Sequence, residues 1–313
     1  MAAAIGQIRQ SVPDLKLSVV VCSRNRCRDL ESCVASILAS PRTDFELVVI
    51  DQSDGADADA AVRAHQADVR LRYLPTTSRG LSRARNEALA QARAQVLAFT
   101  DDDCRVEPTF VTRVIEFFER RPEVAMAFGE VTAPEELHAK GHIATFTPQE
   151  QTFLGRFPSP MQPWGIGANM AFRRDAAVRV GAFDPELGAG AKIPAGEELD
   201  FTIRVLGAGL AVATTPSFVV THLGVREHEA ARHLFLGYLE GAGAAYAKNV
   251  RLGTRGANLL FVSWFFGLNK EIVRAALKRR RPLGVGMMLA GMRGGMAALR
   301  RPLDRMTQTL GKP

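Results

Sequence analysis

Three consecutive carboxylates, Asp101, Asp102 and Asp103, directly follow the apolar run QVLAFT at 95–100. Neighbouring carboxylates repel one another unless a cation or hydrogen-bond donors offset their charge. A hard divalent cation with oxygen ligands does this, usually while it also holds the phosphates of a substrate. We therefore predict a Mg²⁺ or Mn²⁺ site here, whereas the alternative interpretation is an acidic turn in solvent.

Polar side chains also follow two other apolar runs. Ser23 and Asn25 come after LSVVVC at 17–22, and Asp51 ends the run FELVVID. In an open parallel sheet, ligands bind at the carboxyl ends of the strands, where helix N-termini also point. We expect these groups to converge with the three aspartates, although Asp51 taken alone also fits a helix cap.

The elements that must position these groups alternate between strand and helix. Continuous β-branched runs predict buried strands, and these lie at 17–22, 45–50, 69–74 and 95–100. Apolar residues at helical spacing predict helices at 29–38, 60–67, 82–94 and 111–120. Such alternation predicts an α/β fold with a mostly parallel central sheet.

The second half of the chain is less regular. Strands are predicted at 124–131 and at the end of 164–172, with an irregular, proline-containing segment between them. Helices are predicted at 197–206 and, much longer, at 227–249. These elements must complete the site that the first half begins.

Four segments of the first half resemble the nucleotide-sugar-binding half of a family 2 glycosyltransferase with the GT-A fold: SVVVCSRNR, VVIDQSDG, GLSRARNEALAQA and FTDDDC. Three later segments resemble the same family in the same order: WGIGANMAFRR at 164–174, GEELDFTIRVLGAG at 196–209, and VTH ending at His222. The resemblance implies a Rossmann-like sheet flanked by helices. It also implies inverting transfer of a sugar from a UDP-, dTDP- or GDP-linked donor to a hydroxyl acceptor.

The resemblance also divides the chain. Residues 1–15 form an N-terminal extension, 16–123 the nucleotide-sugar-binding half and 124–250 the acceptor-binding and catalytic half. Residues 251–313 lie outside the resemblance and form a basic, apolar, helical C-terminal tail. The expected architecture is a GT-A domain with a C-terminal helical appendage.

The metal site is assigned by resemblance to the family's DXD motif. Asp101 and Asp103 match it, with Asp103 the preferred direct ligand and Asp101 nearer the ribose. Asp102 fits either role. His222 matches the family's late histidine and would complete the metal shell through a neutral ring nitrogen. The alternative for His222 is an ordinary surface or capping histidine.

The nucleotide is assigned by the same resemblance to Ser23, Asn25 and Asp51, with Asp51 accepting hydrogen bonds from the base or ribose. Arg79 and Arg85 flank the start of the Ala-rich helix, where the family places an arginine near the base or diphosphate. Arg85 is the better candidate of the two.

The general base of the family is the aspartate of its Gly-Glu-Asp motif, and this chain has Glu198 at that position, after Glu197. An acceptor hydroxyl needs such a base close to the attacking oxygen. Glu198 is the predicted base and Glu197 the fallback, although glutamates in the first turn of a helix also stabilise its dipole. Trp164, Gly167 and Asn169 are predicted to line the acceptor or sugar pocket, with Trp164 equally suited to anchor a loop.

The formal net charge of +7 is unevenly distributed. Residues 251–313 hold 13 Lys and Arg against two acids, a net +11, which leaves −4 on the first 250 residues. With 47% hydrophobic and 23% charged residues, the composition excludes a mostly disordered or fibrous chain. A basic tail on a slightly acidic body indicates an anionic partner surface.

Residues 256–269 of the tail are apolar and uncharged but fall short of the ~20 residues that span a bilayer. Cations flank them, including KRRR at 278–281, which favours an interfacial anchor on anionic lipid. The alternative is a helical hairpin packed on the catalytic domain or in a homodimer. The cations alternate with aliphatic blocks, so no nucleic acid partner is expected.

No apolar leader is visible at the N-terminus. None of the four cysteines forms a CxxC pair, which indicates ordinary thiols in a reducing compartment. We therefore expect a cytoplasmic protein, bound peripherally to the inner face of the cell membrane, with a membrane- or lipid-linked acceptor within reach.

Two other functions remain open. A sugar-phosphate nucleotidyltransferase would carry a glycine-rich loop after the first strand, but SRNRCRD has no glycine. A non-catalytic nucleotide-sugar-binding protein would be expected to lose the metal carboxylates or the base, and this chain keeps candidates for both.

Overall fold

The computed structural model describes residues 14–55, 62–154, 158–160, 162–277 and 283–311. Four parallel strands open the chain in the order β3-β2-β1-β4. They are β1 (Leu17–Ser23), β2 (Phe45–Asp51), β3 (Leu71–Pro75) and β4 (Val96–Asp101). The helices among and after them are α2 (Cys27–Leu38), α4 (Leu81–Gln91) and α5 (Phe110–Arg120). The predicted alternation of strands and helices is therefore confirmed, apart from the helix predicted at 60–67: of its described residues only 62 and 63 are helical, and 64–67 form a turn.

The sheet continues from β4 in the order β8-β6-β9-β5. Strand β8 (Asn169–Arg173) runs antiparallel between β4 and β6 (Val124–Thr132), while β9 (Ala211–His222) is parallel to β6. Two short strands, β5 (Cys104–Val106) and β7 (Thr152–Leu154), pair antiparallel with β9. The α/β fold class with a central sheet flanked by helices is confirmed.

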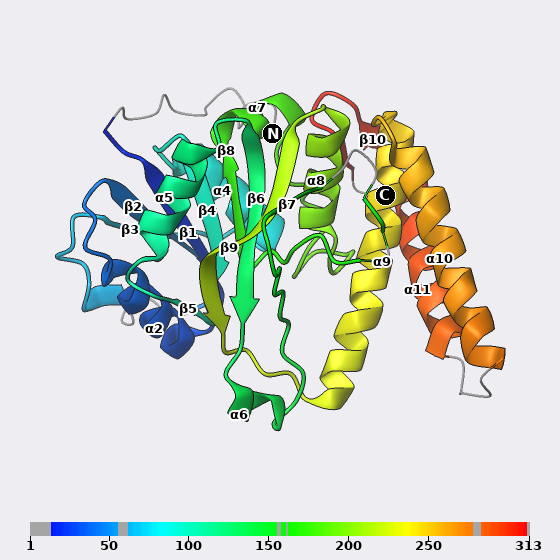
Figure 1. Ribbon diagram of the computed structural model, residues 1–313, viewed down its shortest axis with the longest axis horizontal. Helices are drawn as coiled ribbons and strands as arrows, with labels where there is room; N and C mark the ends of the chain where they lie inside the picture. The colour runs from blue at the N-terminus through cyan, green and yellow to red at the C-terminus, as the bar shows by residue number, and fades with distance from the viewer. Residues whose placement is uncertain (1–13, 56–61, 155–157, 161, 278–282, 312–313) are drawn as a thin grey trace.

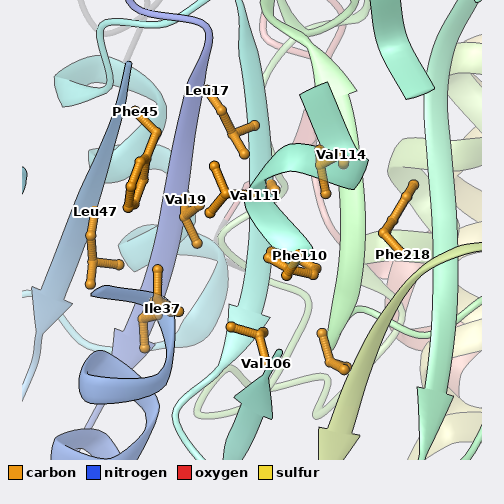
Figure 2. Packing of buried hydrophobic residues seen from close by; sticks show 14 of the residues in the cluster. Leu17, Val19, Ile37, Phe45, Leu47, Val106, Phe110, Val111, Val114 and Phe218 are labelled. Atoms are coloured by element: carbon orange, nitrogen blue, oxygen red, sulfur yellow. The ribbon is translucent and has the colours of Figure 1, made fainter. Parts of the chain in front are cut away.

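Both faces of the sheet are buried, which explains the continuous apolar runs of the strands. Alternate residues of β1 point to opposite faces, so Val19 and Val21 join one core cluster and Val20 joins the other. Helices α2 and α5 cover the first face, and Figure 2 shows Ile37 and Phe110 packed there against strand residues such as Val19. Helix α4 and the later helices cover the second face.

Short helices connect the later strands: α6 (Glu135–His138), α7 (Arg174–Val180) and α8 (Glu197–Gly207). The long helix α9 (His228–Leu252) then packs against α8. Helices α10 (Ala257–Leu277) and α11 (Leu283–Arg300) lie outside α9, and the chain closes with the small pair β10 (Leu303–Asp304) and β11 (Thr309–Leu310) (Figure 1).

The C-terminal residues are part of the packed structure. The predicted boundary between 250 and 251 falls inside α9. Trp264 of α10 is buried in the same cluster as residues of the sheet, and the Leu310 N–H donates to Asp184 at 2.7 Å. Over the residues that can be described, no helix combines the length and apolar character that crossing a membrane requires.

Candidate active site

A cavity of about 390 Å³ opens at the carboxyl ends of β1 and β4. Most of the predicted site residues line it: Ser23, Arg85, Asp101, Asp102, Asp103, Gly167, Glu197, Glu198 and His222. They come from both halves of the chain, because β8 and β9 bring the second half alongside β4. Five predicted residues do not line this cavity: Asn25, Asp51, Arg79, Trp164 and Asn169.

Strand pairing places the acidic triplet against its partners. The register of β5 with β9 sets Cys104 opposite His222, so that His222 Nε2 lies 3.2 Å from Asp103 Oδ1. Ser23, at the end of β1, donates through its hydroxyl to Asp102 at 2.7 Å. Arg26 Nη1 donates to both acids, at 3.0 Å to Asp102 and 2.7 Å to Asp103. Donors therefore offset the charge of two of the three carboxylates.

The three aspartates differ in their pKa values. Burial raises the pKa of Asp102 to about 6 and also raises that of Asp101. Burial would raise the pKa of Asp103 too, but the hydrogen bond and charge of His222 and the charge of Arg26 outweigh it and lower that pKa. Asp103 is thus the carboxylate of the triplet whose charged form the protein stabilises.

The donor set around Asp103 fits a divalent cation. Ligand atoms of Asp103, Cys104 and His222 lie within 4.8 Å of one another. His222 Nδ1 is buried and has no hydrogen-bond partner among the described residues, so a ring nitrogen is open to a ligand. Burial raises the pKa of the Cys104 thiol far above its usual range, which makes it a poor ligand. Asp103 and His222, with Asp101 nearby, supply the carboxylate and imidazole that Mg²⁺ and Mn²⁺ sites use.

The two glutamates begin helix α8, where the backbone leaves little room. Gly196 caps the helix at φ +94°, and a Cβ there would lie 2.5 Å from the carbonyl oxygen of Gly241 on α9. Only glycine accepts both this φ and this contact. The close approach of α9 thereby fixes where Glu197 and Glu198 enter the cavity.

Arg85 distinguishes the two glutamates. Its Nη1 donates to Glu197 at 2.9 Å, both side chains are buried, and its guanidinium lies over the ring of Phe183. Burial, and then the negative charge of Glu197, raise the pKa of Glu198 to about 8. A carboxyl group whose pKa lies near neutrality is well suited to take a proton from a substrate hydroxyl.

The residues predicted for the nucleoside form a network beside the cavity. Asn25 adopts φ +57°, and its backbone N–H donates to Ser53 Oγ at 2.8 Å. The side chains of Asn25 and Arg79 both donate to Asp54. Asp51 accepts from Ser53 and, at 2.6 Å, from the hydroxyl of Tyr73. These contacts tie the loops after β1 and β2 together at the edge of the cavity.

The predicted acceptor residues separate. Gly167 lines the cavity, and a Cβ there would lie 2.8 Å from Arg85 Nη2. Asn169 is buried in the sheet, where its side-chain amide donates to the carbonyl oxygens of Glu130 and Phe218 at 2.8 and 3.1 Å. Trp164 lines a neighbouring apolar cavity instead.

Sequence reasoning missed several polar residues that line the main cavity, among them Arg26, Arg226 and Tyr238. Arg26 adjoins Asn25 in the loop after the first strand, so its position was a usable signal. Tyr238 lies in the middle of α9 and Arg226 in the loop before that helix, where no motif indicates the site. Their place depends on how α9 packs.

Comparison with known proteins identifies a family that matches this chain. The model of the family "Glycosyl transferase family 2" matches residues 18–181, slightly more than half of the chain. The glucosyl-dolichyl phosphate glucuronosyltransferase of Haloferax volcanii is 28% identical over 185 residues, 56% of this chain and 58% of the relative. The succinoglycan biosynthesis protein ExoO of Rhizobium meliloti is 31% identical over 166 residues, 52% and 45% of the two chains. The matched region thus spans about half the length of these relatives.

Solved structures share the fold. The mannosyltransferase PcManGT of Pyrobaculum calidifontis, in complex with GDP-Man and Mn²⁺, has a TM-score of 0.62 at 18% identity, over 96% of this chain and 93% of its own. TarS 1-349 of S. aureus, in complex with UDP-GlcNAc, has a TM-score of 0.56 at 13% identity, over 91% and 92%. At these identities the likeness establishes the GT-A fold alone.

Proposed function

The chain belongs to glycosyltransferase family 2, and we propose that it is an inverting, divalent-metal-dependent glycosyltransferase. Its donor is a nucleotide sugar with a UDP, dTDP or GDP leaving group, and its acceptor is a hydroxyl group. The observation that carries the proposal is one cavity lined by Asp103 and His222 together with the carboxyl group of Glu198. A nucleotidyltransferase would be expected to carry a glycine-rich loop after β1, where this chain has SRNRCRD, and a non-catalytic binding protein would be expected to lose the metal carboxylates or the base.

In the proposed reaction Glu198 takes the proton of the acceptor hydroxyl, and the acceptor oxygen attacks the anomeric carbon from the face opposite the leaving diphosphate. The attack inverts the configuration at that carbon. Arg85 keeps Glu197 paired, so that Glu198 is the carboxyl group left to act. A cation held by Asp103 and His222 would supply Lewis-acid stabilisation of the charge on the diphosphate.

The donor side of the proposal uses the loops after β1 and β2. Ser23, Asn25 and Asp51 would receive the nucleoside at the edge of the cavity, and Arg79 and Arg85 would neutralise charge nearby. The nucleotides bound to PcManGT and TarS in their crystal structures support a nucleotide sugar as the class of donor.

The test is a panel of UDP-, dTDP- and GDP-linked sugars, assayed for nucleotide release with and without Mg²⁺ or Mn²⁺. Release that needs the cation, and that Asp103→Asn lowers by at least about 10²-fold, supports the proposal. Asp175→Asn is the matched control, because Asp175 is an exposed carboxylate on α7. Full turnover in Asp103→Asn, or turnover that chelators leave unchanged, would contradict it.

We also propose that the C-terminal helices lie on an anionic membrane on the cytoplasmic side. Large apolar side chains are exposed at helical spacing on both helices: Leu259, Val262 and Phe266 on α10, and Leu289, Met292, Met296 and Leu299 on α11. The net +11 of residues 251–313 supplies the cations that anionic lipid attracts.

Truncation is a poor test of this contact because the tail is packed into the fold. The double variant Val262→Ser and Phe266→Ser removes exposed apolar surface instead, and flotation with phosphatidylglycerol vesicles measures the binding. The wild type should float with anionic vesicles and the variant should float less. A wild-type protein that stays at the bottom of the gradient and sediments as a dimer would assign this face to a second copy.

A further inference from the structure

A second cavity, of about 290 Å³, adjoins the first and has a different chemical character. Its walls are mainly apolar and aromatic: Phe128, Trp164, Leu199, Tyr238, Tyr246 and Trp264. They come from β6, α8, α9, α10 and the loop before β8. No role has been assigned to this cavity by the proposed chemistry of donor and cation.

The two cavities meet at the predicted base. Glu198, Tyr238 and Ile166 line both of them. An acceptor could therefore place its hydroxyl beside Glu198 while the rest of the molecule occupies the second cavity. The part of the acceptor next to the hydroxyl would then lie in apolar surroundings. The burial that raises the pKa of Glu198 is consistent with the same surroundings.

Most of the wall of the second cavity is apolar or aromatic, and two of its polar side chains are already engaged. Trp164 Nε1 donates to the carbonyl oxygen of Ser159 at 3.0 Å, and Thr202 Oγ1 donates to that of Glu198 at 2.7 Å. A sugar ring needs partners for each of its hydroxyl groups when it is buried. A hydrocarbon chain needs none, so these walls favour a chain over a ring.

We propose that the second cavity binds the hydrocarbon segment next to the reacting hydroxyl or head group, so that the acceptor is an amphiphile with an aliphatic or isoprenoid chain. This inference rests on the proposed function, because it uses Glu198 as the base. It adds a ligand site lined by Trp164 and Trp264 and a chemical class for the acceptor. Each methylene group buried there contributes about fourfold in affinity.

Helix α10 has apolar side chains both on the side that faces the cavity and on the side that faces outward. Trp264 faces inward and is 5% exposed, while Val262 and Phe266, two residues away in either direction, are 47% and 66% exposed. An amphiphile that enters from a membrane on the outer side of α10 would meet apolar surface both at the membrane and in the cavity.

The two tryptophans of the chain both line this cavity, so intrinsic fluorescence reports on it directly. The probes are octyl β-D-glucopyranoside, kept below its critical micelle concentration, and methyl β-D-glucopyranoside. They share a head group and differ only in chain length. We expect the octyl compound to change the tryptophan emission and to bind at least about tenfold more tightly. Equal affinities, or no spectral change, would overturn the inference.

The second measurement compares octyl glucoside binding in variants whose larger side chain fills the cavity. Ala242 lines the cavity on α9, and Ala242→Phe should weaken octyl glucoside binding at least about tenfold. Ala231→Phe adds the same ring to the same helix at a residue outside both cavities and should leave binding unchanged. Ala242→Val is the milder variant if the phenylalanine variant does not fold, and it should weaken binding by an intermediate factor. Undiminished binding in the folded Ala242 variants would place the chain elsewhere and overturn the inference.

Calorimetry with UDP, dTDP and GDP, each in the presence of Mn²⁺, separates this inference from the proposed function. If the nucleotide binds while octyl and methyl glucoside do not differ, the hydrocarbon site is wrong and the glycosyltransferase proposal survives. If no nucleotide binds with Mn²⁺, the proposed function fails, whatever the glucosides do.

Discussion

Arg85 is buried beneath the active site and donates a hydrogen bond to Glu197, while Glu198 has no such cationic partner in hydrogen-bond contact among the described residues. By resemblance this glutamate stands where the family has an aspartate, and its side chain lines both cavities. We therefore propose that one buried ion pair decides which of the two adjacent acids acts as a base.

The pKa of Glu198 leads to a prediction for the pH dependence of the reaction. A base acts in its deprotonated form, and a pKa of about 8 leaves most molecules protonated at neutral pH. Values of kcat/KM should therefore rise from about pH 6 and level off near pH 9. Glu198→Gln should lower kcat/KM by about 10²- to 10⁴-fold, and Glu198→Asp, which keeps a carboxyl group, should lower it less. Wild-type turnover in Glu198→Gln would refute the assignment.

Arg26 leads to a prediction for metal affinity. Its guanidinium contacts the carboxylates of Asp102 and Asp103, so a cation that binds Asp103 must compete with it. Arg26→Gln should tighten Mn²⁺ binding several-fold in the absence of nucleotide, as measured by calorimetry, because it leaves those charges unpaired. Arg24→Gln is the control, since Arg24 pairs with the exposed Asp54. Weaker Mn²⁺ binding in Arg26→Gln would show that Arg26 helps to build the cation site.

At the scale of elements, close contact between α9 and α11 holds the C-terminal layer in place. A Cβ on Gly294 of α11 would lie 1.7 Å from the carbonyl oxygen of Glu240, and one on Gly243 of α9 would lie 2.0 Å from that of Gly291. Glycines at these positions let the two backbones touch. Since α9 also carries Tyr238 and meets Gly196, this contact supports the geometry of the active site.

Two glycines of α11 allow a matched comparison. Gly294→Ala should destabilise the protein by about 1–3 kcal/mol, because the added methyl group forces the helices apart. Gly286 has nothing within 4 Å of a Cβ, so Gly286→Ala should stabilise by up to about 1 kcal/mol through helix propensity. Urea unfolding of both variants measures the difference. A Gly294→Ala variant as stable as Gly286→Ala would mean that α9 and α11 are not in contact in solution.

At the scale of the whole molecule, a buried charge network joins the last described strand to α8, to α9 and to the loop before α8. Lys248 of α9 contacts Asp184 at 3.0 Å and Asp200 of α8 at 2.8 Å, and all three side chains are fully buried. Asp200 also pairs with Arg204, and Asp184 accepts from the backbone of Leu310. Lys248 thus links α9 to α8 and to the loop before α8, and Asp184 in that loop links to the last described strand.

Removing that lysine should therefore cost far more than removing a surface lysine. Lys248→Met leaves two buried carboxylates without their shared cation and should lower the free energy of unfolding by about 3–5 kcal/mol. Lys16→Met removes an exposed pair with Glu119 and should cost less than about 1 kcal/mol. Equal unfolding midpoints for the two variants would contradict the role of Lys248.

The sequence by itself was sufficient for the fold class, the family and the gathering of the acidic residues. Asp101 and Ser23 each end a buried strand, Asp102 and Asp103 follow directly, and the carboxyl ends of neighbouring parallel strands must meet at one edge of the sheet. The continuous apolar runs and the polar residues that follow them therefore carried that information without any tertiary contact. The roles assigned to these residues remain predictions.

Only the tertiary structure decided the rest, because side chains far apart in sequence meet through packing that no local pattern records. Asn169 lies in a motif but points into the sheet, where it bonds to carbonyl groups 39 and 49 residues away. Trp164 and Trp264 meet in one cavity although 100 residues separate them. Arg85 reaches Glu197 across 112 residues, and this pairing distinguishes Glu197 from Glu198, the predicted base. Part of the tail, which charge and the end of the resemblance set apart, packs against the rest of the chain, because Trp264 of α10 is buried in a cluster that includes residues of the sheet.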